Sequence, residues 1–268
     1  MKHNVNSKDL LPFLSQLTES AGKVILGYFN GEFRVDLKDS RPGAIDIVTD
    51  VDRASEDLIM EGIHREFPDH DILTEETSTE LKGSRWLWIV DPLDGTVNFA
   101  HGYPMFSVSI ALMDSQTLVA GMVYDPLKKE TFYAIRDGGA FLNGHPVRVS
   151  GAARLQESIV STGFPYDKAY SPENNIAEFS RVLLRVQGVR RGGSAALDLS
   201  YVSCGRLDGF WELKLKPWDM AAGMLLVEEA GGRVSDGSGN PTDVHTNCVV
   251  ATNGIIHDML LEVLRPGP

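Results

Sequence analysis

Apolar residues recur at two different periods along this chain, and the change of period predicts its elements. Over 10–28 they follow helical spacing, and they do so again after Asp52, with a stop near Pro68. An apolar residue at every third or fourth position is typical of a helix with one buried face. We therefore expect two helices near the N-terminus that pack together against a flat surface such as a β-sheet.

Shorter apolar runs, rich in β-branched and aromatic residues, come next. They cover 86–90, 105–113, 118–124, 131–135 and 140–142. Turn signals such as Asp137-Gly138-Gly139 and Asn143-Gly144 separate the later ones. Strands this close together, joined by short turns, are typical of an antiparallel sheet.

After Ser150 the pattern alternates between the two periods. It predicts strands at 158–162, 210–213 and 249–252, and helices at 173–186, 195–204, 220–230 and 256–264. The fold class is therefore predicted as α+β with two sheets. No repeat or linker divides the 268 residues, so we expect a single catalytic domain over 1–268, with approximate halves 1–150 and 151–268 that share one active site.

The charge balance narrows the range of partners. Lys and Arg total 25 against 37 for Asp and Glu, a formal net charge of -12. A nucleic acid bound through a broad basic face is disfavoured by this balance, and we expect no such partner. The acidity has two explanations, solubility or carboxylates gathered to hold cations.

The cysteines, the N-terminus and the apolar runs bear on where in the cell the protein is found. The two cysteines, Cys204 and Cys248, have no metal-ligand spacing, and we expect both to be reduced. The N-terminus lacks the apolar stretch of a signal peptide, and no apolar run approaches the ~18 residues that span a bilayer. We expect a soluble, cytoplasmic protein that does not bind membranes.

The segment Asp91-Pro92-Leu93-Asp94-Gly95 carries the strongest chemical signal. It comes where an apolar run ends, and its two carboxylates converge on one point if Pro92-Leu93 makes a turn. Gly95 allows a sharp backbone turn close to a ligand, and the amides after it are suited to hold a phosphate. Taken alone, the segment is also compatible with an ordinary Asp-rich surface turn.

Further acidic segments strengthen the signal. Glu75 and Glu76 form an acidic pair, Asp46 opens an acidic stretch that runs to Asp52, and Asp219 opens an apolar helix. Each has a plain explanation as surface charge or as a helix-terminal charge. Together, Asp46, Glu75, Asp91, Asp94 and Asp219 are the oxygen ligands that Mg²⁺ prefers, so we expect two or three cations. Zinc and copper are disfavoured because these segments contain no cysteine.

Four segments, beginning at Asp46, Glu75, Asp91 and Trp218, resemble the inositol monophosphatase family in order and spacing. The last continues to Glu229-Ala-Gly-Gly232, and the likeness covers roughly 10–264. This resemblance implies a layered α-β-α-β-α sandwich, shared with fructose-1,6-bisphosphatases, and a homodimer. It also implies dependence on two to three Mg²⁺ ions and inhibition by Li⁺.

The resemblance also assigns roles to the acidic residues. Glu75 and Asp91, with the Leu93 carbonyl, would hold one cation; Asp91, Asp94 and Asp219 would hold a second, and a third would lean on Glu75. Asp46 and Thr96, helped by Glu75, would position a metal-activated water for in-line attack on phosphorus. Lys38 is the nearest match to a lysine that the family places before Asp46, and Glu76 is a further candidate beside Glu75.

The implied substrate is a small sugar or cyclitol phosphate, with myo-inositol monophosphate first. The substrate contacts implied by the resemblance come from Asp94, Gly95, Thr96, Ser194, Ala195, Glu212 and Asp219. Fructose 1,6-bisphosphate, histidinol phosphate and 3′-phosphoadenosine 5′-phosphate remain open as substrates. A non-catalytic scaffold protein is the alternative from another class.

Overall fold

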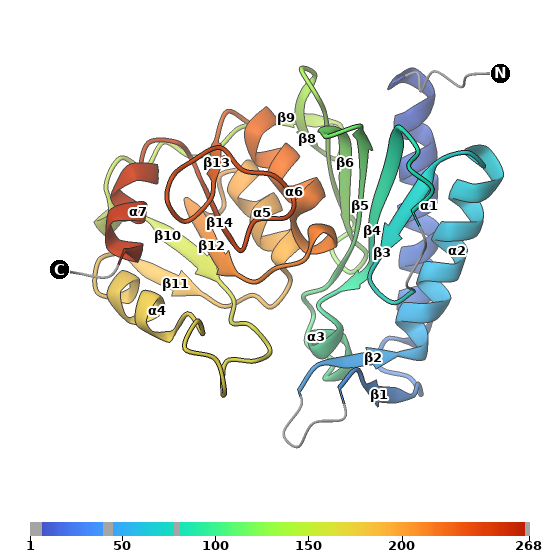
Figure 1. The fold of residues 1–268 in the computed structure, drawn as a ribbon, viewed down its shortest axis with the longest axis horizontal. Coiled ribbons are helices and arrows are strands. Elements are labelled where there is room, and N and C mark those ends of the chain that lie inside the picture. The colour runs from blue at the N-terminus through green and yellow to red at the C-terminus, as the bar shows by residue number, and fades with distance from the viewer. Residues whose placement is uncertain (1–6, 40–44, 78–80, 266–268) are drawn as a thin grey trace.

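The computed structural model describes residues 7–39, 45–77 and 81–265, and these form five layers of helices and sheets (Figure 1). The helices are α1 (Ser7–Tyr28), α2 (Asp50–Glu66), α3 (Thr96–Ala100), α4 (Ile176–Leu183), α5 (Ala195–Ser203), α6 (Pro217–Glu229) and α7 (His257–Leu264). A single 3₁₀ turn, Leu155–Glu157, precedes the second sheet. No described helix is long and apolar enough to cross a membrane.

The larger sheet has seven strands in the order β3-β4-β5-β6-β7-β8-β9. Their bounds are β3 (Asp71–Thr74), β4 (Trp86–Asp94), β5 (Ser107–Asp114), β6 (Thr117–Asp125), β7 (Glu130–Ile135), β8 (Gly139–Leu142) and β9 (His145–Val147). All neighbours are antiparallel, as expected, except the parallel pair β3 and β4. A two-stranded ribbon of β1 (Val35–Leu37) and β2 (Ile47–Thr49) lies beside α3.

The second sheet has five strands in the order β11-β10-β12-β14-β13. Their bounds are β10 (Ile159–Thr162), β11 (Gly188–Arg190), β12 (Gly209–Leu213), β13 (Arg233–Ser235) and β14 (Cys248–Thr252). β10 is parallel to both of its neighbours, and the other pairs are antiparallel. Strands β11 and β13 are three residues long, too short to stand out in the hydrophobic pattern.

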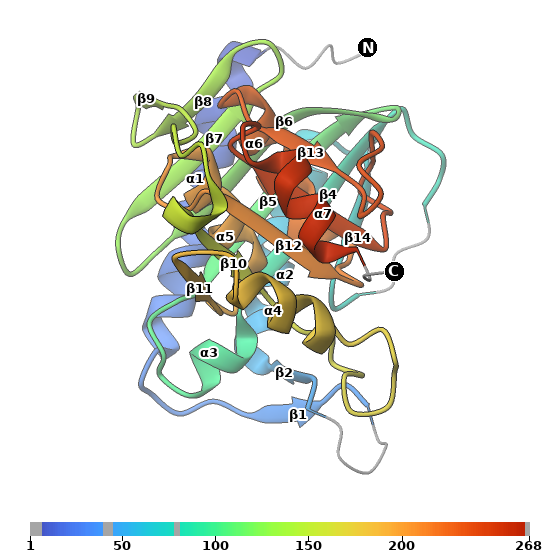
Figure 2. The same cartoon turned by 90° about the vertical axis from the view of Figure 1, so that its left-hand side faces the viewer.

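Three hydrophobic cores hold the layers together. One core, around Trp88, joins α1 and α2 to the outer face of the seven-stranded sheet. A second, around Phe210 and Leu225, fills the space between the two sheets, where α5 and α6 lie (Figures 1 and 2). The third, around Trp211, joins α4 and α7 to the far face of the five-stranded sheet. The predicted α+β class and layered α-β-α-β-α sandwich are confirmed.

Among the predicted elements, two differ most from their expected bounds. The helix expected over 173–186 is shorter, because Asn175 has a left-handed backbone (φ 67°) and α4 begins only after it. The Asn175 amide donates to the Gly163 carbonyl (2.6 Å), which fixes this start against the end of β10. The strand expected over 86–90 runs on through Asp94, so both aspartates of the acidic segment belong to β4.

Candidate active site

Asp91 and Asp94 lie on β4, and an irregularity in the strand brings them to the same place. Asp91 is opposite Ser109 on β5, whereas Asp94 is opposite Ser107, so three steps on β4 match two steps on its partner. In a regular strand two residues three apart face opposite sides of the sheet. The extra residue is a β-bulge, which reverses that alternation. The bulge thus does what the sequence analysis expected of a turn at Pro92-Leu93.

A cavity of about 400 Å³ opens between the two halves of the chain, and the predicted residues line it. Lys38, Asp46, Glu75, Asp91, Leu93, Asp94, Gly95 and Thr96 come from the first half. Ser194, Ala195, Glu212 and Asp219 come from the second. Glu76 is the one candidate that does not line the cavity, although it is bonded to Lys38.

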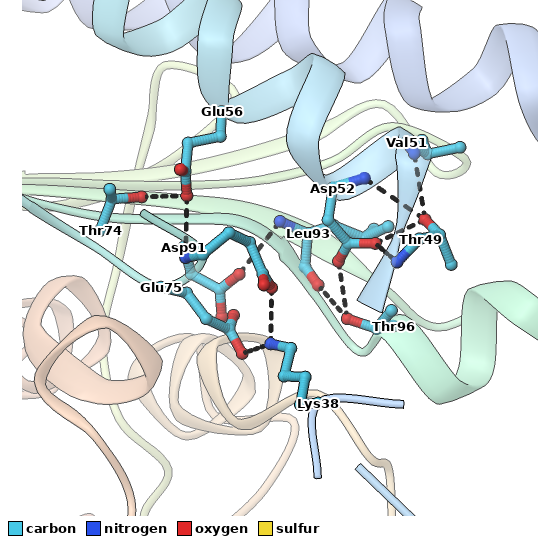
Figure 3. A network of polar contacts seen from close by, with 11 residues as sticks. Lys38, Thr49, Val51, Asp52, Glu56, Thr74, Glu75, Asp91, Leu93 and Thr96 are labelled. Carbon is cyan, nitrogen blue, oxygen red and sulfur yellow. Dashed lines mark hydrogen bonds and ion pairs between the residues drawn. The ribbon is translucent and has the colours of Figure 1, made fainter. Parts of the chain in front are cut away.

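The Lys38 ammonium group pairs with the acidic turn that follows β3 (Figure 3). Its Nζ atom lies 2.6 Å from Glu75 Oε1 and 2.5 Å from Glu76 Oε1. The charges and hydrogen bonds of these two carboxylates outweigh burial and raise the pKa of Lys38. Buried Glu56 on α2 fixes the turn by accepting from the Thr74 hydroxyl (2.6 Å) and the Glu76 amide (3.0 Å).

Asp94 joins the two halves of the chain at the beginning of α5. Its carboxylate accepts hydrogen bonds from the Ser194 hydroxyl and from the amides of Ala195 (3.2 Å) and Ala196 (2.9 Å). The Ser107 hydroxyl on β5 adds a fourth (3.3 Å). Burial raises the pKa of Asp94 to about 6, although the hydrogen bonds from α5 act in the opposite direction. The Ala195 amide, expected to face the substrate, is therefore bonded to Asp94.

Asp219 enters the same cavity from α6. One of its oxygens, Oδ2, accepts the Lys216 amide (2.6 Å) and caps the helix, as its position at the helix start suggests. Among the described residues, no three acidic, His or Cys side chains are gathered closely enough to form a ready-made metal cluster. One oxygen of Glu75 is bonded to Lys38 and one oxygen of Asp219 to the Lys216 amide.

Burial and mutual repulsion together dominate the electrostatics of these side chains. Burial, followed by the charges of Glu75, Asp94 and Asp219, raises the pKa of Asp91 far above its usual range. Burial and the Glu75 charge do the same for the pKa of Asp219. A set of buried carboxylates that repel one another and offer only oxygen is the donor set that a hard divalent cation stabilises.

Thr96 is bonded to an aspartate that was not among the predicted site residues. The Thr96 hydroxyl lies 2.9 Å from Asp52 Oδ1 and 3.1 Å from the Leu93 carbonyl (Figure 3). The Asp46 side chain is not bonded to Thr96. Asp52, in the first turn of α2, is fully buried, whereas Asp46 is half-buried at the cavity wall before β2. In the structure Thr96 is thus bonded to Asp52, and the role of Asp46 in positioning the water stays a prediction.

Sequence reasoning missed Asp52 although a signal for it exists. Thr49 and Asp52 form a capping box at the start of α2, in which Asp52 Oδ2 accepts the Thr49 amide (2.8 Å). A threonine followed three residues later by an acidic residue predicts such a box. In such a box the acidic side chain turns back toward the residue before the helix, so a helix start at Thr49 places the Asp52 side chain near the strand that precedes α2. Tyr166 and Asp198, which also line the cavity, had no local signal.

The fold and the cavity together define a class. Carboxylates from two sheets face one cavity, and no Cys or His is among the described residues that line it. The family model of the inositol monophosphatase family matches residues 6–267. The chain belongs to the inositol monophosphatase family, and it is a phosphatase.

Individual relatives agree over nearly the whole chain. The inositol-1-monophosphatase of Synechocystis is 44% identical over 261 residues, covering 97% of this chain and 91% of that protein. A fructose-1,6-bisphosphatase/inositol-1-monophosphatase of Thermotoga maritima is 40% identical and covers 96% of each chain. The crystal structure of the extragenic suppressor protein suhB from Bartonella henselae has a TM-score of 0.90 at 38% identity, covering 97% of this chain and all of that one.

Proposed function

We propose that this phosphatase hydrolyses myo-inositol monophosphate to inositol and inorganic phosphate, with Mg²⁺ as its cofactor. One observation carries the proposal: Glu75, Asp91, Asp94 and Asp219, from both halves of the chain, line one cavity. Burial, together with the charge of neighbouring carboxylates, raises the pKa of Asp91 and Asp219, so cations bound there would stabilise the charged carboxylates and relieve their repulsion.

The donor set fits magnesium. Glu75, Asp91 and the Leu93 carbonyl would hold one ion, Asp91, Asp94 and Asp219 a second, and Glu75 would contribute to a third. Bound there, the ions would neutralise charge on the phosphoryl group and lower the pKa of water in the cavity. Li⁺ would inhibit by competing for one of these positions.

The chain's own residues orient the reactants. Thr96 and Asp52 would hold the attacking water, since the Thr96 hydroxyl can accept a proton from water while donating its own to Asp52, 2.9 Å away. The amides of Gly95 and Thr96 would bind the phosphate oxygens; Gly95 has a φ of 95°, and a side chain there would meet the Met105 carbonyl at 3.0 Å. The water oxygen forms the new bond to phosphorus as the bond to the inositol oxygen breaks, and that oxygen takes up a proton.

The substrate assignment depends on Glu212 of β12. Its carboxyl group lines the cavity, and burial together with the charges of Asp219 and Asp198 raises its pKa well above the usual range. A buried carboxyl that gains hydrogen bonds from substrate hydroxyls disfavours ligands that lack them. Fructose 1,6-bisphosphate is the second candidate, because the exposed Arg191 side chain at the cavity can bind a second phosphate and the Thermotoga relative carries both names.

We also propose that the protein is cytoplasmic and forms a homodimer.

Phosphate release from myo-inositol 1-phosphate and from fructose 1,6-bisphosphate tests the proposal, each with Mg²⁺, with EDTA, and with Mg²⁺ plus Li⁺. We expect turnover only with Mg²⁺, inhibition by Li⁺, and a higher kcat/KM for the inositol ester. A preference for the bisphosphate would keep the chemistry and change the substrate. Turnover that persists in EDTA would contradict the cation site itself.

A further inference from the structure

A second carboxyl group, Asp198 on α5, lies in the same cavity as Glu212 and has no role in the reaction described so far. It is one turn further along the helix than Ser194 and Ala195, so it shares their helix face. Only 2% of the residue is exposed, yet it lines the cavity. A buried carboxyl group is rare unless it has a partner or a ligand.

The backbone leaves space for both carboxyl groups. A Cβ atom on Gly192 would lie 2.6 Å from Asp198 Oδ1, and one on Gly163 would overlap the Glu212 carboxylate. Gly163 directly follows β10, and Gly192 follows its parallel neighbour β11. The carboxyl ends of parallel strands are where α/β sheets bind ligands. Two neighbouring strand ends thus each present a glycine against which a carboxyl group lies.

The bonds of Asp198 leave it able to bind a ligand. Its Oδ2 atom accepts from the Ser161 hydroxyl of β10 (2.7 Å), which ties α5 to the sheet, and Oδ1 lies on the Gly192 side. Burial raises the pKa of Asp198 to about 7, and the nearby Arg191 charge lowers it. The same guanidinium group acts on Glu212, so Arg191, Asp198 and Glu212 share one electrostatic environment.

We propose that Asp198 is a specificity-determining residue that binds hydroxyl groups of the polyol together with Glu212. This inference rests on the proposed function, since it concerns the part of the same substrate that does not react. Two carboxyl groups in one cavity can bind hydroxyls on several neighbouring carbons of a ring, whereas a single carboxyl group contacts the ring hydroxyls along one side only. An ester without hydroxyls leaves both groups buried without a ligand, which disfavours it.

The test compares kcat/KM for myo-inositol 1-phosphate with that for p-nitrophenyl phosphate, which has no hydroxyl on its ring. In Asp198→Asn the amide oxygen can still accept from Ser161, so the fold is retained. We expect the preference for the inositol ester to fall about tenfold, mainly through a higher KM, which is the loss expected for one hydrogen bond to a charged group. A preference that stays within about twofold of the original would overturn the inference.

Ser161→Ala separates recognition from anchoring. This variant removes the hydroxyl that holds Asp198 but leaves the carboxyl group in the cavity, so we expect a lower melting temperature and a largely retained substrate preference. If Ser161→Ala lowers the preference as much as Asp198→Asn does, Asp198 only anchors α5, and the inference is wrong. A wild-type enzyme that prefers p-nitrophenyl phosphate would instead refute the proposed inositol substrate.

Discussion

The two carboxylate oxygens of Asp52 have different partners, Thr49 and Thr96, and the two contacts have different roles. Its Oδ2 atom accepts the Thr49 amide and so ends the ribbon and begins α2. Its Oδ1 atom accepts from Thr96, which lies on the cavity wall. Burial raises the pKa of Asp52, while hydrogen bonds from Thr49 and Thr96 lower it. One carboxylate therefore links the start of a helix to the chemistry of the cavity.

We predict that Asp52→Asn lowers kcat for myo-inositol 1-phosphate by about a hundredfold or more, in the range of lost acid-base assistance. The asparagine oxygen can still accept a hydrogen bond from Thr96, but the neutral amide cannot take up a proton, so the hydroxyl can no longer draw one from the attacking water. Asp46→Asn is the matched comparison, and we expect a loss below about tenfold because Asp46 is not bonded to Thr96. Steady-state kinetics at saturating Mg²⁺ provide both values. A larger loss of kcat in Asp46→Asn than in Asp52→Asn would instead support Asp46 as the residue that positions the water with Thr96.

At the scale of elements, the end of α6 is fastened to the hairpin between β7 and β8. Glu229 Oε1 accepts the Asp137 amide and Oε2 accepts the Gly139 amide, each at 2.9 Å. Asp137 has a left-handed backbone (φ 62°), as a tight hairpin turn requires. The Glu229-Ala-Gly-Gly232 segment, which contributed to the family resemblance, thus has a structural role at this end of the helix.

We predict that Glu229→Ala lowers the free energy of unfolding by about 2 kcal/mol, because two turn amides lose their acceptor. For a chain of this size that corresponds to a melting temperature lower by about 5 °C. Glu228→Ala is the control: its pair with Arg136 is about one-third exposed and contributes below about 1 kcal/mol. Thermal unfolding of both variants gives the comparison, and equal shifts would mean that the hairpin does not depend on Glu229.

The prediction of elements from the sequence succeeded where the hydrophobic pattern is long. The N-terminal helices, the strands from 105 to 142 and the helix after Trp218 were all expected. The bulge in β4 was not expected. It depends on how β5 pairs with β4, and the residues of β4 alone do not indicate it. The late start of α4 was also missed, since it depends on Asn175 contacting the end of β10.

At the scale of the whole molecule, two halves with different sheets contribute to one cavity. The first half supplies Glu75, Asp91 and Asp94, and the second supplies Asp219 together with the α5 terminus that binds Asp94. The acidic segments could be identified from the sequence, because carboxylates beside turn residues form a local pattern. Which of them pair could not, since the Asp52–Thr96 bond joins α2 to α3 across 44 residues.

The most direct test of the account is phosphate release from myo-inositol 1-phosphate by Asp91→Asn at saturating Mg²⁺. Asp91 is 1% exposed and is the carboxylate that both proposed cation positions share. We predict a loss in kcat of at least about a thousandfold, with a melting temperature in EDTA equal to or above that of the wild type, because the substitution removes a repelling charge. A folded Asp91→Asn enzyme with near-full activity would contradict the proposal that these carboxylates bind the cations of a phosphatase.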